Sequence, residues 1–110
     1  MGTTKTHKFS SSQNEIAQLF KVLGHPARIA IIEYIGKQKD CICANLVSEL
    51  GLAQATISQH LAELKQANLI KGEIDGKKMC YCINETKWEV VKDLFSHFFM
   101  EIDPNCCVNK

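Results

Sequence analysis

Six cysteines stand in this chain of 110 residues, and their types and spacing set the chemistry that it could carry. They come as three close pairs: Cys41 and Cys43, Cys80 and Cys82, and Cys106 and Cys107. Thiolates bind soft ions such as cadmium, lead and copper(I), and they also bind zinc. No export signal opens the chain, so we expect a cytoplasmic protein with reduced thiols. The pattern therefore predicts a metal-binding or redox-active thiol site and not a disulfide framework.

The three pairs differ in their expected surroundings. Cys41 and Cys43 fall in the first turn of a predicted helix, where unpaired backbone N–H groups stabilise a thiolate, although the carboxylate of Asp40 opposes this effect. Cys80 and Cys82 are two residues apart in a predicted strand and so share one face. We interpret this second pair as packing residues and the other two pairs as candidate ion ligands.

A row of polar side chains could read DNA. Ile57, Leu61 and Leu64 are spaced to face inward from a helix over residues 54–67, and Thr56, Gln59, His60 and Glu63 form the opposite stripe. Glutamine suits adenine edges, and serine and threonine suit bases or phosphates. Taken singly, each could be an ordinary solvated residue, and His60 could instead cap or pack locally. The candidate DNA-binding residues are Gln54, Thr56, Ser58, Gln59 and His60, with Lys77 and Lys78 at a hairpin tip.

The elements that must position these residues follow from hydrophobic periodicity. Helices are predicted over residues 13–23, 26–35, 41–50 and 54–67, with a last helix starting at Thr86 and ending before Pro104. Between them the period changes to that of strands, over residues 69–74 and 78–83, around the turn signal Asp75-Gly76. The order αααα-ββ-α is mainly helical with a small β-hairpin (α+β). It predicts a winged helix-turn-helix.

The domain organisation is expected to be simple. We predict a disordered tail over residues 1–12, a domain for DNA binding and dimerisation over 13–103, and a cysteine-containing tail over 104–110. The net charge is only +1, so DNA binding needs a local basic face or a dimer. No apolar run approaches the length of a membrane span, and no membrane partner is expected.

The last helix carries more large apolar side chains than a small core can cover. They recur at 3-4-3-4 spacing, typical of a helix–helix seam: Trp88, Val91, Phe95, Phe98 and Ile102. We therefore expect a homodimer. The alternative is that this helix packs only on its own domain.

Four segments carry a resemblance to a known family. Residues 20–28 read Phe-Lys-Val-Leu-Gly-His-Pro-Ala-Arg, residues 40–43 Asp-Cys-Ile-Cys, residues 50–61 Leu-Gly-Leu-Ala-Gln-Ala-Thr-Ile-Ser-Gln-His-Leu, and residues 76–84 Gly-Lys-Lys-Met-Cys-Tyr-Cys-Ile-Asn. Over about residues 14–100 the chain resembles the ArsR/SmtB family of dimeric winged-helix repressors, which release DNA on binding metal or metalloid ions. Ala53 stands where the family usually has a capping serine, a loss of about 1 kcal/mol.

The resemblance implies a transcriptional repressor that leaves its operator when trivalent arsenic, as arsenite or methylarsenite, binds cysteine thiolates. In similar arsenic sensors the motif reads Cys-x-Cys-x-x-Cys, but Leu46 stands at its third position here. The adjacent cysteines near the end resemble a second kind of arsenic site. The expected ligands are Cys41, Cys43, Cys106 and Cys107. Either pair could lead, with the third sulfur coming from elsewhere, and arsenic would be an inducer and not a permanent cofactor.

Other readings stay open within the same fold. A sensor of Cd²⁺ or Pb²⁺ would also use the Cys-x-Cys pair, although no further cysteine precedes Cys41. A redox or sulfide sensor would convert its thiols to disulfides.

The family's zinc or nickel site is disfavoured, because Phe95 stands where a histidine ligand is expected after Asp93. We expect no enzyme, since no Cys-x-x-Cys, phosphate loop or nucleophile-plus-base arrangement occurs; a winged helix that binds only proteins is a further alternative.

Overall fold

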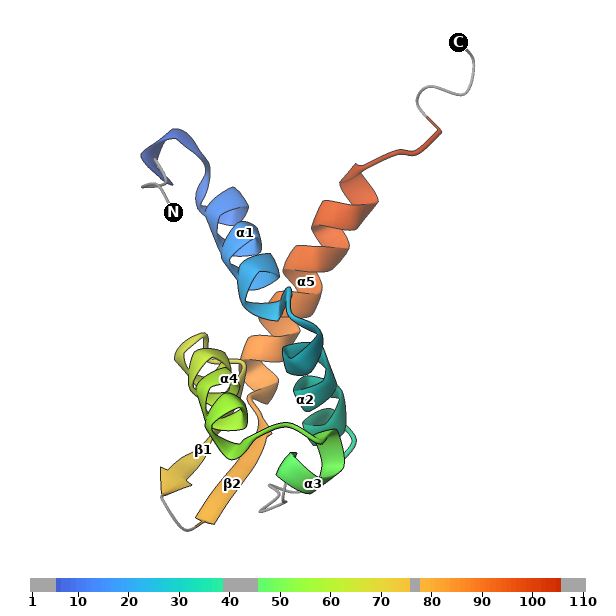
Figure 1. Ribbon diagram of the computed structural model, residues 1–110. Coiled ribbons are helices and arrows are strands. Elements are labelled where there is room, and N and C mark those ends of the chain that lie inside the picture. Colours follow the sequence, from blue (N-terminus) through green and yellow to red (C-terminus); the bar gives the residue numbers. More distant parts are fainter. Residues whose placement is uncertain (1–5, 39–45, 76–77, 106–110) are drawn as a thin grey trace.

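The computed structural model describes residues 6–38, 46–75 and 78–105, and it has the predicted order of elements (Figure 1). In chain order the elements are η1 (Thr6–Lys8), α1 (Ser11–Leu23), α2 (Pro26–Gly36), α3 (Leu46–Leu50), α4 (Gln54–Gln66), β1 (Ile70–Asp75), β2 (Lys78–Ile83) and α5 (Glu85–Glu101). The expected winged helix-turn-helix, mainly helical with one hairpin, is confirmed. In Figure 1 the β-hairpin lies at one end of the molecule, and α1 and α5 extend toward the other.

Capping residues explain where the helices begin. The Ser10 side chain accepts a hydrogen bond from the backbone of Gln13, and Gln13 returns one, so α1 begins two residues before the predicted start, inside the expected tail. The Asn84 side chain caps α5, which therefore begins one residue before Thr86. Ala53 precedes α4 without a side-chain cap bond, as expected. The predicted start of α3 at residues 40 and 41 lies outside the described residues.

The core lies where α1, α2, α4, the hairpin and α5 meet. The predicted inward residues of α4 are confirmed, because Ile57, Leu61 and Leu64 are all at most 1% exposed. On α2, Ile31 and Ile35 are buried. Ile29 on the same helix is 43% exposed, because the other elements cover one face of α2.

The hairpin is a two-stranded antiparallel sheet in which Ile70 pairs with Ile83 and Gly72 with Tyr81. Gly72 has a φ of +141°, a conformation that side-chain-bearing residues rarely adopt. Tyr81 is almost fully buried, and burial raises the pKa of its phenol to about 12. This hairpin of β1 and β2 is the wing of the winged helix. Because its two strands are paired along their length, the wing projects from the domain in a fixed direction.

Hydrogen bonds connect the start of α5 to the end of the helix-turn-helix. The Leu69 carbonyl accepts one hydrogen bond from the Trp88 indole, with an N···O distance of 2.9 Å, and another from the Asn84 backbone at 3.1 Å. Leu69 lies between α4 and β1. The first turn of α5 is therefore held close to the end of α4.

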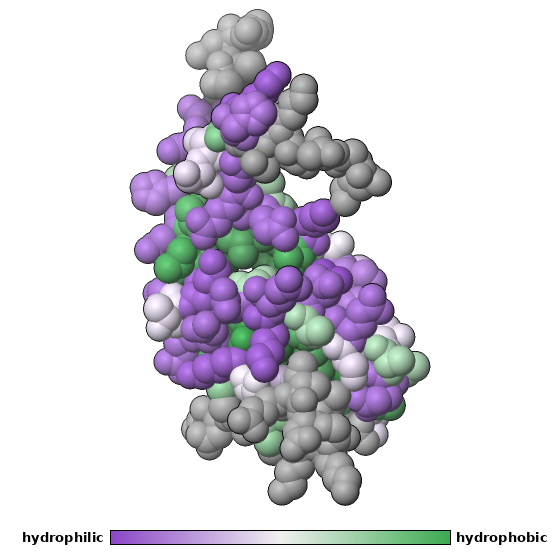
Figure 2. Space-filling view, turned by 90° about the vertical axis from the view of Figure 1, so that its left-hand side faces the viewer, coloured by the Kyte–Doolittle hydropathy of each residue, from purple (hydrophilic) through white to green (hydrophobic). Residues whose placement is uncertain are grey.

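An aromatic face remains open on α1 and α5. The Phe20 ring stacks on Phe95 with 4.9 Å between centroids, and Phe98 and Phe99 contact the same cluster edge-on. Phe99 is 57% exposed and Met100 83%. In Figure 2, hydrophobic patches interrupt the hydrophilic surface midway along the molecule. Within the described ranges, the helices are too short or too polar to cross a bilayer.

Candidate nucleic-acid interface

The outward side of α4 carries most of the residues that the sequence predicts for DNA contact. Gln54, Thr56 and Gln59 are exposed, and Ser58 is half-buried. The Gln54 amide nitrogen donates to the Ser58 hydroxyl over 3.1 Å, which brings these two side chains together on one turn. Since Ile57, Leu61 and Leu64 hold the opposite side in the core, α4 presents a row of hydrogen-bonding groups to its surroundings.

His60 lies elsewhere, and the prediction that it belongs to the exposed stripe is wrong. Its side chain is only 7% exposed. It follows Ile57 by three residues and precedes Leu64 by four, so it lies at the inward edge of the helix. Burial lowers the pKa of His60 below its ordinary value, and the nearby His25 and Arg28 groups lower it further.

Arg28 and His25 are the partners of His60, and the sequence analysis assigned neither of them to a site. The Arg28 Nε donates to the His60 Nδ1 over 3.1 Å, and the Arg28 Nη1 donates to the Val22 carbonyl over 3.0 Å. The His25 ring lies 4.5 Å from the His60 ring, and His25 caps α2 by accepting from the Ala27 backbone. The available signal was a cation, Arg28, next to the apolar run of residues 29–32, since a partly buried cation needs acceptors.

The wing is described only in part. Lys77 lies outside the described residues, and Lys78 begins β2 opposite Asp75. Lys65, in the last turn of α4, and Lys71 of β1 are exposed. These two lysines add positive charge to the elements beside the row of polar groups on α4.

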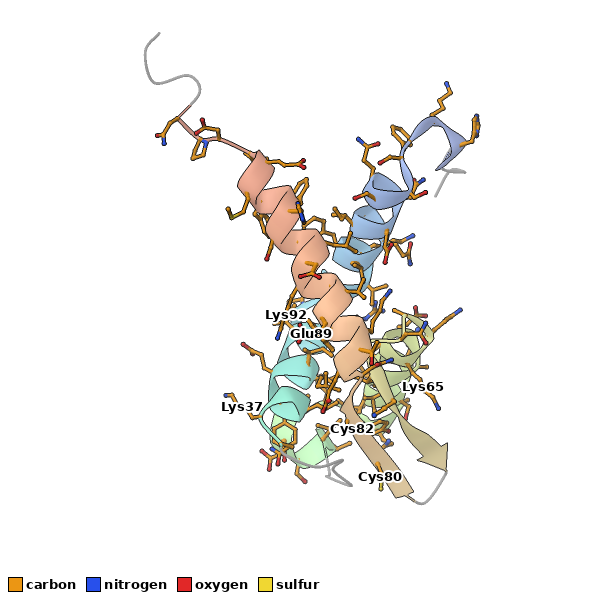
Figure 3. The ribbon with its side chains drawn as sticks, turned by 180° about the vertical axis from the view of Figure 1, so that it is seen from behind. Lys37, Lys65, Cys80, Cys82, Glu89 and Lys92 are labelled. Carbon is orange, nitrogen blue, oxygen red and sulfur yellow. The ribbon has the colours of Figure 1, made fainter. Side chains whose placement is uncertain are left out.

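The cysteines divide into two groups. Cys41, Cys43, Cys106 and Cys107 lie outside the described residues. Cys80 and Cys82 are half-buried on β2 (Figure 3), and both are disulfide-bonded. Reduced thiols were expected from the sequence, and that expectation is wrong for this pair. Within residues 6–38, 46–75 and 78–105, no three metal-binding side chains gather into a site.

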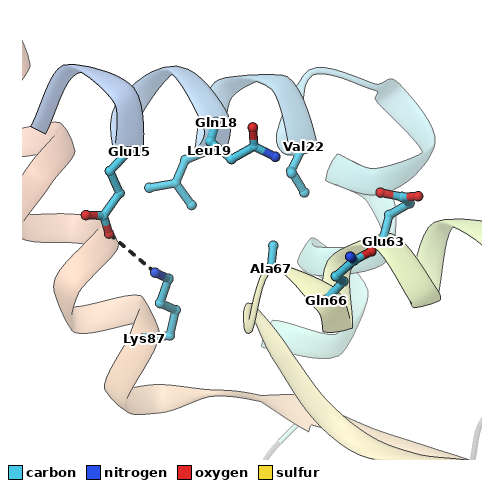
Figure 4. A pocket seen from close by; sticks show the side chains of 8 residues that line it. All are labelled: Glu15, Gln18, Leu19, Val22, Glu63, Gln66, Ala67 and Lys87. Carbon is cyan, nitrogen blue, oxygen red and sulfur yellow. Dashed lines mark hydrogen bonds and ion pairs between the residues drawn. The ribbon is translucent and has the colours of Figure 1, made fainter. Parts of the chain in front are cut away.

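A cleft of about 500 Å³ separates α1, the end of α4 and the start of α5 (Figure 4). Its lining contains charged, polar and apolar side chains: Glu15, Gln18, Leu19, Val22, Glu63, Gln66, Ala67 and Lys87. Lys87 of α5 reaches Glu15 of α1 at 3.4 Å. None of the described residues that line this cleft is a cysteine.

The geometry of a helix-turn-helix with a wing agrees with the comparisons. Residues 25–71 match the family described as "Bacterial regulatory protein, arsR family". The transcriptional repressor PagR of Bacillus anthracis is 31% identical over 85 residues, which cover 77% of this chain and 85% of PagR. This chain belongs to the ArsR family. Its members are transcriptional regulators and not enzymes, which confirms the expected class.

Two further relatives support the ArsR fold. The HTH-type transcriptional regulator Rv0081 of Mycobacterium tuberculosis is 37% identical over 67 residues, which cover 61% of this chain and 59% of Rv0081. Its crystal structure aligns with a TM-score of 0.58 and 26% identity, covering 84% of this chain and 97% of that one. HlyU of Vibrio cholerae aligns with a TM-score of 0.62 over 84% of this chain and 99% of its own, at 21% identity, and shows the fold alone.

Proposed function

We propose that this ArsR-family protein is a cytoplasmic transcriptional repressor that binds operator DNA as a homodimer and dissociates when trivalent arsenic binds its cysteine thiolates. The observation that carries the DNA-binding part is the outward row on α4, where Gln54, Thr56 and Gln59 are exposed beside Ser58. An α-helix fits the major groove of DNA, where each base pair presents a distinct pattern of donors and acceptors. The wing lysines Lys77 and Lys78 would reach the backbone beside this groove.

The aromatic face on α1 and α5 supports the homodimer. Phe98, Phe99, Met100 and Ile102 all leave at least a third of their surface exposed, on one end of α5. Monomeric soluble proteins rarely leave large contiguous apolar patches open to water. A second copy packed on this face would form an interface with two-fold symmetry and present two α4 helices to a near-palindromic site.

Thiolate chemistry supports arsenic as the inducer. Trivalent arsenic is thiophilic and commonly takes three sulfurs, and the proposed ligands come from Cys41, Cys43, Cys106 and Cys107. The ion is an inducer in this proposal, so it needs to be bound only in the state that leaves DNA. Its effect on DNA affinity would correspond to a coupling free energy of about 1–3 kcal/mol. Cadmium and lead are the competing ions.

A second candidate function is favoured by one observation, namely that Cys80 and Cys82 of the wing are disulfide-bonded. In this second candidate function, the repressor responds to oxidation or to sulfide. Formation or loss of a disulfide then changes how the wing lies against DNA. The two candidates differ in what restores DNA binding. A thiol reductant would reverse the redox response without any metal.

The deciding experiment is fluorescence anisotropy on DNA from upstream of the protein's own gene, under reducing conditions. Arsenite, methylarsenite, cadmium and zinc are titrated separately. Release at stoichiometric arsenical is expected, and Cys41→Ser and Cys106→Ser then identify the leading pair. Release by cadmium alone supports the competing ion. If release occurs only after the reductant is withdrawn, and Cys80→Ser and Cys82→Ser abolish it, the redox candidate replaces the arsenic proposal.

Replacing Gln59 with alanine is expected to weaken specific DNA binding about tenfold or more, because a good bidentate contact to a base is worth about 1–3 kcal/mol. Gln59 is exposed, so the variant should fold normally. The matched control is Gln66→Ala, which makes the same change on the same helix at a residue that lines the cleft. Equal affinities of Gln59→Ala and the unmodified protein for the operator would remove Gln59 from the interface.

A further inference from the structure

We propose that the hydrogen bond between Arg28 and His60 holds α4 in its DNA-binding position, and that protonation of His60 releases it, so that operator affinity falls on acidification. The inference deepens the proposed function, and it rests on that function only for its DNA readout. It assigns His60 a positioning role in place of the base contact expected from its sequence position.

One guanidinium joins three helices at this point. Arg28 stands in the first turn of α2, and its two donor groups reach the Val22 carbonyl in the last turn of α1 and the His60 ring in α4. The planar guanidinium holds its N–H groups in a fixed geometry, so the bond to Val22 of α1 orients the Nε–H group that meets His60 of α4. Among the buried side chains that the structure describes, His60 is the one with a basic group.

The contact requires a neutral His60. Its Nδ1 accepts a hydrogen bond from the Arg28 Nε–H group, so that nitrogen carries no hydrogen of its own. An imidazolium has two donors and no acceptor, so protonation breaks the bond and places a positive charge against the guanidinium. The His25 ring also lies against His60, with 4.5 Å between the ring centroids.

The charges that act most strongly on His60 oppose its protonation. Those that act on it come from His25 and Arg28. On the other elements packed against α4, the charged residues Glu49 of α3 and Lys71 of β1 are exposed, as is Glu63 on α4 itself. Exposed groups are screened by solvent, and they compensate a buried charge only weakly.

The direction of the pH effect follows from linkage. Above pH 6.5, the ordinary pKa of a histidine, His60 is neutral in the folded and the unfolded chain. Below that value the unfolded chain binds a proton that the native contact excludes, because the pKa of His60 is lowered in the fold. The contact is therefore fully stabilising above pH 6.5 and loses stability as the pH falls.

The test compares the unmodified protein with His60→Gln between pH 7.5 and pH 5.5. A glutamine carbonyl can accept the Arg28 hydrogen bond but does not titrate in this range. The probe is a duplex selected from random sequences with the unmodified protein at pH 7.5. We expect its affinity to fall about tenfold more over this range for the unmodified protein than for His60→Gln. When release is coupled to the uptake of one proton, the affinity changes by at most about tenfold for each pH unit below the ordinary pKa of histidine. His7→Gln, the same change at an exposed site in η1, should behave like the unmodified protein.

A second measurement needs neither DNA nor a variant. Amide-exchange protection factors, corrected for the intrinsic pH dependence of exchange, should fall for α4 at pH 5.5 and stay constant for α5. Equal pH dependence of His60→Gln and the unmodified protein, or protection of α4 that does not change with pH, would overturn the proposal. If no duplex can be selected, the repressor function fails while the exchange measurement still decides on the contact.

Discussion

Gly72→Ala is expected to lower the free energy of unfolding by about 3 kcal/mol or more, the cost of a severe backbone clash at a strained position. A Cβ atom at Gly72 would lie 1.9 Å from the Cys80 carbonyl oxygen and 3.0 Å from the Tyr81 Cα. Both are backbone atoms of the paired strand, so neither can move aside without breaking the register of the hairpin. The φ of +141° adds strain for any residue with a side chain.

Urea unfolding followed by circular dichroism measures the effect. The matched control is Gly36→Ala, because a Cβ at Gly36 meets nothing within 4 Å at the end of α2. That control should leave stability unchanged or raise it by about 0.5–1 kcal/mol. A Gly72→Ala protein with the unfolding midpoint of the unmodified chain would show that β1 and β2 pair in another register.

Phe99→Glu is expected to raise the dissociation constant of the proposed homodimer at least about 100-fold, because an unpaired carboxylate buried in an interface costs several kcal/mol. Phe99 is 57% exposed, and its ring lies 5.4 Å from Phe98 and 6.3 Å from Phe95. In the single chain the new carboxylate would stay in water, so the fold should survive. Loss of the dimer should also remove tight binding to a two-half-site operator.

Sedimentation equilibrium measures the dissociation constant directly. The control is His97→Glu, which introduces the same charge on the same exposed end of α5. At 3.6 residues per turn, a residue two positions from Phe99 points to the opposite side of the helix. A Phe99→Glu protein that remains dimeric at the concentration of the unmodified protein would exclude the aromatic face as the interface.

Periodicity was enough to predict the elements, since apolar residues at helical spacing had to face one core. Ile57, Leu61 and Leu64 are buried as their spacing requires. The same reasoning failed for His60, which lies at the boundary between the inward and outward sides of α4. Its burial depends on Arg28, a partner 32 residues earlier in the chain, and such a tertiary contact has no signature in local spacing.

The thiol sites show a second limit of sequence reasoning. Close pairs predict soft-ion or redox chemistry, because that chemistry depends on residue type and local spacing. Whether a given cysteine enters a disulfide depends on which cysteines the fold brings within reach of it. Cys80 and Cys82 share a face of β2 as predicted, yet their disulfide-bonded state could not be read from their separation.

The Leu69 carbonyl connects the start of α5 to the end of α4 through a short stretch of backbone. It accepts hydrogen bonds from Asn84 and Trp88 at the start of α5, and it lies three residues beyond Gln66, the last residue of α4. A rotation of α5 must therefore carry Leu69 with it or break both bonds, and the displacement reaches the end of α4 through three peptide units. In the proposed homodimer, a rearrangement between the two copies at α5 would therefore change the spacing of their α4 helices.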